Sequence, residues 1–488
     1  MSRPAVASEN LLKPIMSPKN NRRTRIIATL GPATESPEMI ETLITEGVNI
    51  FRINMSHAKH DQVRDNVATI RKISRENVTR VGIMMDSRGP EIRTGDVPKD
   101  LPLEAGQLIG LTVRGEKSAE EFSVDVNYDQ MVEDIRIGDV VLIDNGTIEL
   151  KVEEKKRNQL LCKVLTPGTL KSRRHVNLPG VRVNLPSLTQ QDKEDIKLGI
   201  ELGVDWFAMS FVREPEDVRQ LKAILDYHNA PQQVIAKLED QEGIRNLDEI
   251  IRAADAIMVA RGDLGIECPF EELPIIQRRM VKQCAMQGKP VIIATHMLES
   301  MIENPSPTRA EITDTANAVY EQADAIMLSG ETSIGSYPVK CVQMMNRISA
   351  RIERSGGAGF YDDVTMVSKF AKLVKSAAVL AEECQADALI VFTETGIIAR
   401  NAARLRLVST PIYAFSGNEV LLNQLPLFWG IHASHLEMKE NPDDNLRRAM
   451  NKLSERGLLK RGETVVAVTE VRVNDRLVDT ILMETFEG

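Results

Sequence analysis

The sequence feature that most constrains the fold is a repeated unit, in which a short apolar run ends in polar or charged residues and a helical pattern follows. The runs lie at residues 24–34, 49–60, 81–95, 205–211, 234–240, 256–263, 290–297 and 325–333. Within the first three runs and within the last five, the spacing of about 20 to 35 residues is what a parallel strand and its crossover helix require. Helical patterns fill the gaps, for example at residues 215–227, 273–287 and 308–321. Eight such units predict an α/β fold, the (β/α)8 or TIM barrel, with a functional site at the carboxyl ends of the strands.

The barrel pattern is interrupted after its third strand and is followed by further elements. Short β-rich runs separated by glycine-containing turns fill residues 90–183, which predicts a β-barrel-like insert that could act as a mobile lid. After the linker-like stretch SGGAGF at residues 355–360, strand and helix patterns predict a small open α/β domain. The predicted division is a flexible arm (1–22), a barrel in two parts (23–89 and 184–354), a β-rich lid (90–183) and a C-terminal α/β domain (355–488).

Composition excludes several classes of protein. The 488-residue chain has a net charge of -9, which argues against nucleic-acid binding as its main function. Its five widely spaced cysteines indicate a reducing compartment, which predicts a cytoplasmic location, and they form no zinc-type pair. No apolar run approaches about 18 residues, so we expect no membrane span. The polar first twenty or so residues predict a flexible arm, with a transit peptide as the weaker alternative.

Two strand ends between Val234 and Glu267 carry the most informative chemistry. In VIAKLEDQEG, the period of two places Lys237 and Glu239 on one face at the end of a strand. In AIMVARGDLGIE, Asp263 follows a glycine at which a ligand can approach the backbone. Glu239 and Asp263 suit a hard divalent cation such as Mg²⁺, and Lys237 could hold a phosphate or an oxyanion beside it. For this pair alone, a salt bridge that caps two parallel strands is an equal alternative.

The second and third strands end in the same way. In NIFRINMSH, Arg52, Asn54 and Ser56 share one face, while apolar residues occupy the other. The third strand ends in Asp86 and Ser87 within the sequence DSRGPEIRTG. Polar side chains on the inner face at the end of a strand fit a site better than a core. The recurrence of this pattern favours an enzyme.

With these residues in view, the chain resembles the pyruvate kinase family over almost its whole length. The motifs that carry the resemblance are TLGPAT, FRINMSH, DSRGPEIRTG, VNLPG, AKLEDQEG, MVARGDLGIE, ATHMLESM, PTRAE and MLSGETSIGSYP. The resemblance implies a transferase of glycolysis that moves the phosphoryl group of phosphoenolpyruvate to ADP, giving pyruvate and ATP. It also implies Mg²⁺ (or Mn²⁺) and K⁺ as cofactors, a homotetramer, and no membrane or nucleic-acid partner.

The resemblance further implies roles for individual residues. The implied catalytic residues are Arg52, Lys237, Thr295, Ser329 and Glu331. The implied substrate-binding residues are Arg52, Lys237, Gly262, Asp263 and Thr295. Glu239 and Asp263 are the implied Mg²⁺ ligands, and Asn54, Ser56, Asp86 and Ser87 are the implied K⁺ ligands. His57, Arg93 and Arg174 match positions on the nucleotide side, and Glu91 matches the form associated with dependence on K⁺.

Three departures from the family pattern bear on function. His296 replaces the common glutamine beside Thr295, and it could alter the pH profile near its own titration range. His175 stands before VNLPG where a glycine is more usual, which makes lid contacts with the nucleotide less certain. Ile397 and Ile398 follow Gly396, where effector-binding members carry hydroxyl side chains. We therefore predict that fructose bisphosphate does not activate the enzyme through this turn.

Several alternatives remain open from the sequence. A metal-dependent aldolase or lyase that forms a pyruvate enolate would share the pair of carboxylates, but it would not explain the implied K⁺ ligands, the lid or the C-terminal domain. A non-catalytic protein on a retired scaffold is the third interpretation. His57 could simply lie at the surface where a helix begins. The turn Thr393–Gly396 could hold a phosphate at a helix N-terminus or be an ordinary capped turn.

Overall fold

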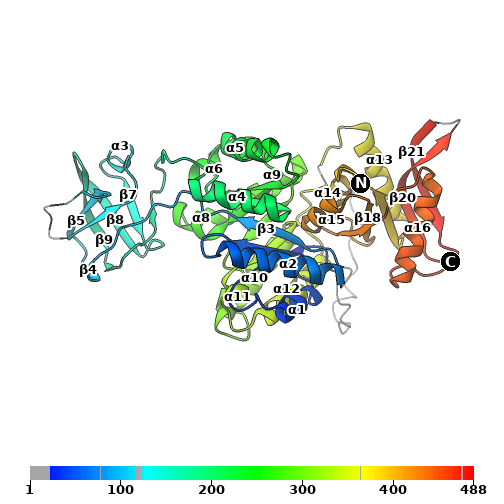
Figure 1. The fold of residues 1–488 in the computed structure, drawn as a ribbon, viewed down its shortest axis with the longest axis horizontal. Coiled ribbons are helices and arrows are strands. Elements are labelled where there is room, and N and C mark those ends of the chain that lie inside the picture. The colour runs from blue at the N-terminus through cyan, green and yellow to red at the C-terminus, as the bar shows by residue number, and fades with distance from the viewer. Residues whose placement is uncertain are drawn as a thin grey trace.

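A computed structural model describes residues 22–76, 79–116, 118, 120, 122–362, 364–473 and 476–488. The predicted arm lies outside the described residues except for Arg22. The molecule is elongated, with a β-rich domain at one end, a barrel in the middle and an α/β domain at the other end (Figure 1). Among the described residues, no helix has the length and apolar character needed to cross a membrane.

The central body is a closed barrel of eight parallel strands, as predicted. In barrel order the strands are β1 (Arg25–Thr29), β16 (Ala325–Leu328), β15 (Val291–Ala294), β14 (Ala256–Ala260), β13 (Gln233–Leu238), β12 (Trp206–Met209), β3 (Gly82–Asp86) and β2 (Ile50–Asn54). Around them lie α1 (Pro37–Thr45), α2 (His60–Glu76), α4 (Gln190–Leu202), α5 (Pro215–Tyr227), α7 (Leu247–Ala253), α9 (Leu273–Gln287), α10 (Arg309–Tyr320) and α12 (Pro338–Glu353). Short helices follow three strand ends: α6 (Gln241–Arg245), α8 (Arg261–Glu267) and α11 (Gly330–Ser333).

The sequence sets both the helix starts and the two faces of each strand. Ser36 accepts a hydrogen bond from Met39 N at the start of α1, and Thr308 forms a capping box at the start of α10. On β13, Val234 packs with the outer helices while Ile235 packs inside the barrel. Both faces are buried, which is the reason the strands are nearly continuous apolar runs.

The amino-terminal end of the barrel is closed by the C-terminal domain. The inner-barrel residues and the core of that domain form one apolar cluster, and the rings of Trp206 and Phe428 lie 6.3 Å apart. The C-terminal sheet has the order β19 (Ile431–His435), β18 (Ile412–Ser416), β17 (Ala388–Phe392), β20 (Thr464–Val473) and β21 (Arg476–Thr485). The helices of this domain are α13 (Lys369–Glu383), α14 (Ile397–Arg404), α15 (Glu419–Gln424) and α16 (Pro442–Glu455). The last strand is antiparallel, a feature that the sequence pattern did not predict.

The insert after β3 has its own core and lies beyond the carboxyl end of the barrel (Figure 1). Its main sheet has the order β11 (Val176–Asn177), β7 (Val140–Ile143), β8 (Ile148–Lys156), β9 (Gln159–Thr166), β5 (Leu108–Val113) and β6 (Ser123–Val126). A second pair joins β4 (Leu101–Leu103) to β10 (Gly168–Leu170), and α3 (Met131–Asp134) links β6 to β7. The expected β-barrel-like insert is therefore a curled sheet with a separate strand pair. The insert and the C-terminal domain thus lie at opposite ends of the barrel.

Candidate active site

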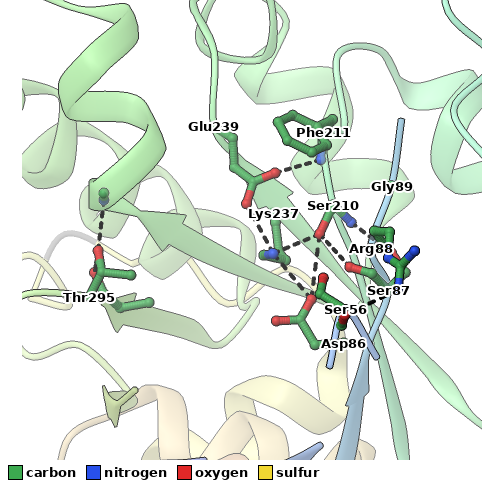
Figure 2. A network of polar contacts seen from close by, with 12 residues as sticks. Ser56, Asp86, Ser87, Arg88, Gly89, Ser210, Phe211, Lys237, Glu239 and Thr295 are labelled. Carbon is green, nitrogen blue, oxygen red and sulfur yellow. Dashed lines mark hydrogen bonds and ion pairs between the residues drawn. The ribbon is translucent and has the colours of Figure 1, made fainter. Parts of the chain in front are cut away.

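A buried lysine lies at the centre of a polar network at the carboxyl ends of the barrel strands. Lys237 extends from β13, and its Nζ lies 3.0 Å from Glu239 Oε1 and 3.1 Å from Asp86 Oδ1. The same amine donates a hydrogen bond of 2.7 Å to Ser210 Oγ (Figure 2). The predicted pairing of Lys237 with Glu239 is thus present, and Asp86 from the third strand joins it. One ammonium group therefore faces two carboxylates inside the mouth of the barrel.

Burial and charge set the protonation of this network. Burial alone would lower the pKa of Lys237, but the charges of Asp86 and Glu239 outweigh burial and raise it. Burial would raise the pKa of Asp86, but Lys237 and Arg52 outweigh burial and lower it. Burial raises the pKa of Glu239, and the nearby charge of Asp263 raises it further against the opposing effect of Lys237. Lys237 and Asp86 are therefore held charged. For Glu239, the single ammonium of Lys237 does not offset burial and the charge of Asp263, so its pKa stays raised.

The carboxylates of Glu239 and Asp263 fit a divalent cation. Glu239 lies just past β13 with its Oε2 accepting a hydrogen bond of 2.7 Å from Phe211 N, which fixes its orientation. Asp263 lies in the first turn of α8 and is close enough to raise the pKa of Glu239. Within the described ranges, no cluster of three or more His, Cys, Asp or Glu side chains could enclose a metal. A cation here would need oxygen ligands from a substrate as well, which is how Mg²⁺ usually binds.

Arg52 is held at the other side of Asp86. Its Nε lies 2.6 Å from Asp86 Oδ2, and one terminal nitrogen donates to Thr29 Oγ1 at 3.1 Å. The arginine side chain is 12% exposed, so it keeps some access to solvent. Arg52 and Lys237 are therefore brought together through one carboxylate, which places two cations side by side where an anionic substrate could bind.

The backbone at the start of α8 is tied to the end of β15. Gly262 N donates a hydrogen bond of 2.7 Å to Thr295 Oγ1 (Figure 2). Thr295 and His296 both have positive φ angles, 67° and 54°, which non-glycine residues rarely adopt. Arg261 supports this turn by donating to Thr295 O at 2.6 Å. Residues held in such conformations occur often at ligand sites, where the surrounding contacts fix them.

The four implied K⁺ ligands lie together at the ends of β2 and β3. Asn54 pairs with Asp86 in the strand register, and Asn54 Oδ1 accepts from Ser56 N at 3.2 Å. Ser87 O accepts a hydrogen bond of 2.8 Å from Ser210 Oγ. Side-chain and backbone oxygens thus gather at one place, which is the ligand type that hard cations prefer.

Glu331 and Ser329 lie beside this site, at the end of β16. The two carboxylate oxygens of Glu331 accept hydrogen bonds from Leu298 N at 2.9 Å and Ser329 N at 2.7 Å. Glu331 is 2% exposed, and burial raises its pKa despite these bonds. These contacts suit a residue that positions the turn after β15, which carries Thr295. The direct catalytic role implied for Glu331 and Ser329 stays a prediction.

Two of the three residues implied for the nucleotide, Arg93 and Arg174, lie where the insert joins the barrel. His57 is exposed in the turn after β2. Arg93 pairs with Glu91 at 2.7 Å and donates to Arg173 O at 3.0 Å. Arg174 Nη1 lies 3.3 Å from Asp144 Oδ1 within the insert. Arg93 forms an isolated antiparallel bridge with His175, the residue that follows Arg174. The two arginines are therefore close along paired backbone segments.

Sequence reasoning missed two residues that the network uses. Ser210 contacts Lys237 and Ser87, and Thr29 contacts Arg52. Both could have been found by the period of two, because Ser210 continues the inward face of Trp206 and Ala208, and Thr29 continues that of Ile27. The side chain of His296 lies 3.5 Å from Glu299 and is 58% exposed, so it points toward solvent and not toward Lys237.

These features define a class of protein before any comparison. A TIM barrel with a lysine, an arginine and a carboxylate pair at its carboxyl end is suited to a metal-assisted reaction of a small anionic substrate. A family model for the barrel domain of pyruvate kinase matches residues 21–342, and one for its alpha/beta domain matches residues 371–482. The chain belongs to the pyruvate kinase family.

Individual relatives agree with this assignment. The chain is 40% identical over 466 residues to a pyruvate kinase of Sporosarcina psychrophila, covering 93% of this chain and 78% of the relative. It is 39% identical over 452 residues to a chloroplastic plastidial pyruvate kinase of Arabidopsis thaliana, covering 92% of this chain and 79% of the relative. A crystal structure of a pyruvate kinase from Cryptosporidium parvum superposes with a TM-score of 0.89 at 33% identity, covering 94% of this chain and 96% of the other.

Proposed function

We propose that this chain transfers the phosphoryl group of phosphoenolpyruvate to ADP at the mouth of the barrel and releases pyruvate and ATP. The observation that carries the proposal is the placement of Lys237 between Asp86 and Glu239, with Arg52 on the far side of Asp86. A transfer of this kind leaves little covalent work to the protein, so that positioned charges provide most of the catalysis. This network supplies two such cations, and both side chains are largely buried.

Each residue has a task that follows from its place. The Lys237 ammonium stabilises the charge that develops on the transferring phosphoryl group and on the enolate left behind, because its amine faces the mouth from a buried position. Arg52 holds the phosphoryl oxygens with its planar fork. The backbone N–H groups at the start of α8, together with Thr295 Oγ1, hold the substrate carboxylate, which a helix N-terminus favours.

Two cations complete the proposed site. Glu239 and Asp263 would hold Mg²⁺ (or Mn²⁺), which would neutralise negative charge on the phosphoryl and enolate oxygens. Asn54, Ser56, Asp86 and the backbone oxygen of Ser87 would hold K⁺ beside the phosphoryl position. Arg93 and Arg174 would contact ADP from the joint with the insert, and His57 would approach the nucleotide from the turn after β2.

We also propose that the insert closes over the site as a lid. Its return strand is tied to the barrel by Asn177, whose Nδ2 donates to Glu267 Oε1 at 3.2 Å. Glu267 lies at the end of α8, the helix whose first turn carries Asp263. A movement of the insert would therefore act on the segment that carries Gly262 and Asp263.

The reaction is tested by ³¹P NMR on the purified chain with phosphoenolpyruvate and Mg²⁺ in potassium buffer. With ADP present, we expect the signal of phosphoenolpyruvate to be replaced by that of the γ-phosphate of ATP. Without ADP, we expect the signal to stay. Loss of phosphoenolpyruvate without ADP would point to a lyase or phosphatase, and no loss with ADP would point to a non-catalytic protein.

Two wider assignments belong to the same proposal. Five free cysteines support a reducing, cytoplasmic compartment. Exposed apolar side chains on one flank of the barrel support a homotetramer: Phe270, Ile275, Ile312 and Tyr320. Light scattering on the eluting chain tests the assembly, and a mass of a single subunit across micromolar concentrations would rule it out.

A further inference from the structure

A cavity of about 570 Å³ lies where the barrel meets the C-terminal domain, far from the carboxyl ends of the barrel strands. Its walls come from α2, the end of α4, α15, β19 and α16. The lining residues are Arg71, Ser74, Arg75, Arg80, Leu202, Glu419, Asn423, Ala433, Ser434, His435, Lys452 and Arg456. Five of them are lysine or arginine and one is an acid, in a chain whose net charge is -9. The cavity is therefore much more positively charged than the chain as a whole.

Two of the five cations are neutralised by carboxylates. Arg71 pairs with Asp205 at 2.8 Å beneath the cavity, and Arg80 pairs with Glu419 across the junction of the two domains. Arg71 also donates a hydrogen bond of 2.9 Å to Gly203 O. These contacts hold the Arg71 and Arg80 side chains in place as walls of the cavity.

The other three cations have no carboxylate partner among the residues that the structure describes. Lys452 Nζ donates to His435 O at 2.7 Å, and an Arg456 terminal nitrogen donates to Ser434 Oγ at 2.9 Å. Both partners are neutral, so these hydrogen bonds orient the cations without cancelling their charge. Arg75 lies exposed in the last turn of α2 and makes no ion pair within the described ranges.

The cations oppose one another electrostatically. Burial lowers the pKa of Arg456, and the charge of Arg80 lowers it further against the opposing charge of Glu455. Burial likewise lowers the pKa of Lys452, followed by the charges of Arg456 and Arg80. Like charges held this close are unfavourable unless an anion joins them.

We propose that this junction cavity binds the phosphate ester of a small metabolite. Arg75, Lys452 and Arg456 would bind the phosphate group, because none of the three forms an ion pair among the described residues and each carries N–H donors. Asn423 and Ser434 would face a hydroxylated carbon skeleton, and Leu202 and Ala433 would give it apolar contact. The cavity volume falls in the range usual for small-molecule sites and exceeds what a single phosphate ion fills.

Calorimetric titration of the full chain tests the proposal with four probes: inorganic phosphate, glycerol 3-phosphate, sorbitol 6-phosphate and sorbitol. The cavity variant is the double substitution R75Q/R456Q. The matched control is R64Q/R447Q, which removes one arginine from α2 and one from α16 at positions that do not line the cavity. Binding of phosphate at the catalytic site is common to all three proteins, so it cancels in the comparison.

We expect sorbitol 6-phosphate to bind the wild type and the control alike, and to bind the cavity variant at least tenfold more weakly. Equal binding to all three proteins, or no binding to the wild type, would overturn the proposal. Inorganic phosphate binding as tightly as sorbitol 6-phosphate would overturn the ester as the ligand. In phosphate-free buffer, the melting temperature of the cavity variant should equal or exceed that of the wild type, because like charges are removed. A phosphate ester should then raise the melting temperature of the wild type and not that of the variant.

Discussion

Two turns in this molecule have the same local design and very different surroundings. In each, a parallel strand ends and a helix begins within a few residues: β14 leads into α8 in the barrel, and β17 leads into α14 in the C-terminal domain. At the barrel turn, Gly262 N donates to Thr295 Oγ1. Lys237 lies on the adjacent strand β13 and contacts Glu239 and Asp86, the latter from β3 on the far side of β12. At the C-terminal turn, Gly396 N donates to Thr393 Oγ1 from its own loop, and Ile397 follows with 56% of its surface exposed.

The difference lies in what the neighbouring strands supply. The C-terminal turn borders a cavity of about 470 Å³ whose lining includes Phe370, Phe392, Ile398, Met438 and the acid Glu394. An acidic and apolar lining disfavours a phosphate, although a helix begins there. At the barrel turn, buried charges from three strands converge. A strand-to-helix turn therefore becomes an anion site only when its neighbours bring positive charge to it.

The largest expected effect comes from removing the central charge. Lys237→Met should lower kcat by at least about 10²- to 10³-fold, because a positioned charge at the reacting oxygens is lost. The control is Lys222→Met, since Lys222 pairs with Asp255 at 2.9 Å near the opposite end of the neighbouring strand β14. Lys222→Met should keep kcat within about twofold. Steady-state kinetics on both proteins checks this.

Loss of Lys237 leaves two buried carboxylates without their shared partner, which alone can cost about 3–5 kcal/mol of stability. Lys237→Arg keeps the charge and separates folding from catalysis. It should fold as the wild type does, by circular dichroism, and still lose most of its activity because the amine is misplaced. Full activity in Lys237→Arg would contradict the central role of this amine.

The next effect separates the two buried glutamates of the site. Glu239→Gln should raise the Mg²⁺ concentration for half-maximal activity by at least about tenfold, because one of two anionic ligands is lost. Glu331→Gln should lower kcat while leaving that concentration nearly unchanged, since both of its oxygens bind backbone N–H groups. A Mg²⁺ titration of each variant decides this, and the reverse pattern would exchange their roles.

A third effect concerns the connection between lid and barrel. Burial raises the pKa of the Glu267 carboxyl from 4.5 to about 7, against the hydrogen bond from Asn177. The folded state therefore binds a proton that the unfolded state releases between these values, so this group stabilises the fold at low pH and loses that contribution as pH rises through about 7.

Glu267→Gln should remove this dependence and stabilise the chain at pH 8 by up to about 3 kcal/mol relative to wild type. Urea unfolding at pH 5.5 and pH 8 measures it. The exposed Glu271→Gln serves as the control and should leave the pH dependence as in the wild type. A pH dependence unchanged in Glu267→Gln would place the titrating group elsewhere.

The smallest expected effect is at the C-terminal turn. Fructose bisphosphate should leave the half-saturating concentration of phosphoenolpyruvate unchanged within about twofold, because Ile397 and Ile398 offer no donor to a phosphate. Initial rates with and without the effector test this. Saturable activation that disappears in Thr395→Ala would show that this turn does bind a phosphate.

The sequence predicted the barrel because its signal is repeated and local. Each barrel strand is buried on both faces, and a proline lies in the first turn of both Pro215–Tyr227 and Leu273–Gln287, which the sequence pattern located to the residue. The antiparallel strand β21 was not predicted, because a single edge strand does not belong to the repeated strand-and-helix pattern. The curl of the insert also depends on contacts between strands far apart in the chain.

The site was partly within reach of sequence analysis. The period of two put Lys237 and Glu239 on one face, and the structure keeps them there. The contact of Lys237 with Asp86 and Ser210 could not be derived this way, because it depends on which strands are neighbours in the closed barrel and on their register. The basic cavity at the domain junction joins residues from both halves of the chain, which no local pattern links.

The most direct test of the account is the rate of pyruvate formation from phosphoenolpyruvate and Mg²⁺, with and without ADP, in potassium or in sodium buffer. We predict turnover that needs both ADP and potassium, as expected if Lys237 acts on a phosphoryl group held beside a monovalent cation. Equal turnover with ADP in both buffers would contradict the proposed potassium site but support the proposed reaction. Absence of turnover in folded protein under all four conditions would contradict the proposed function itself.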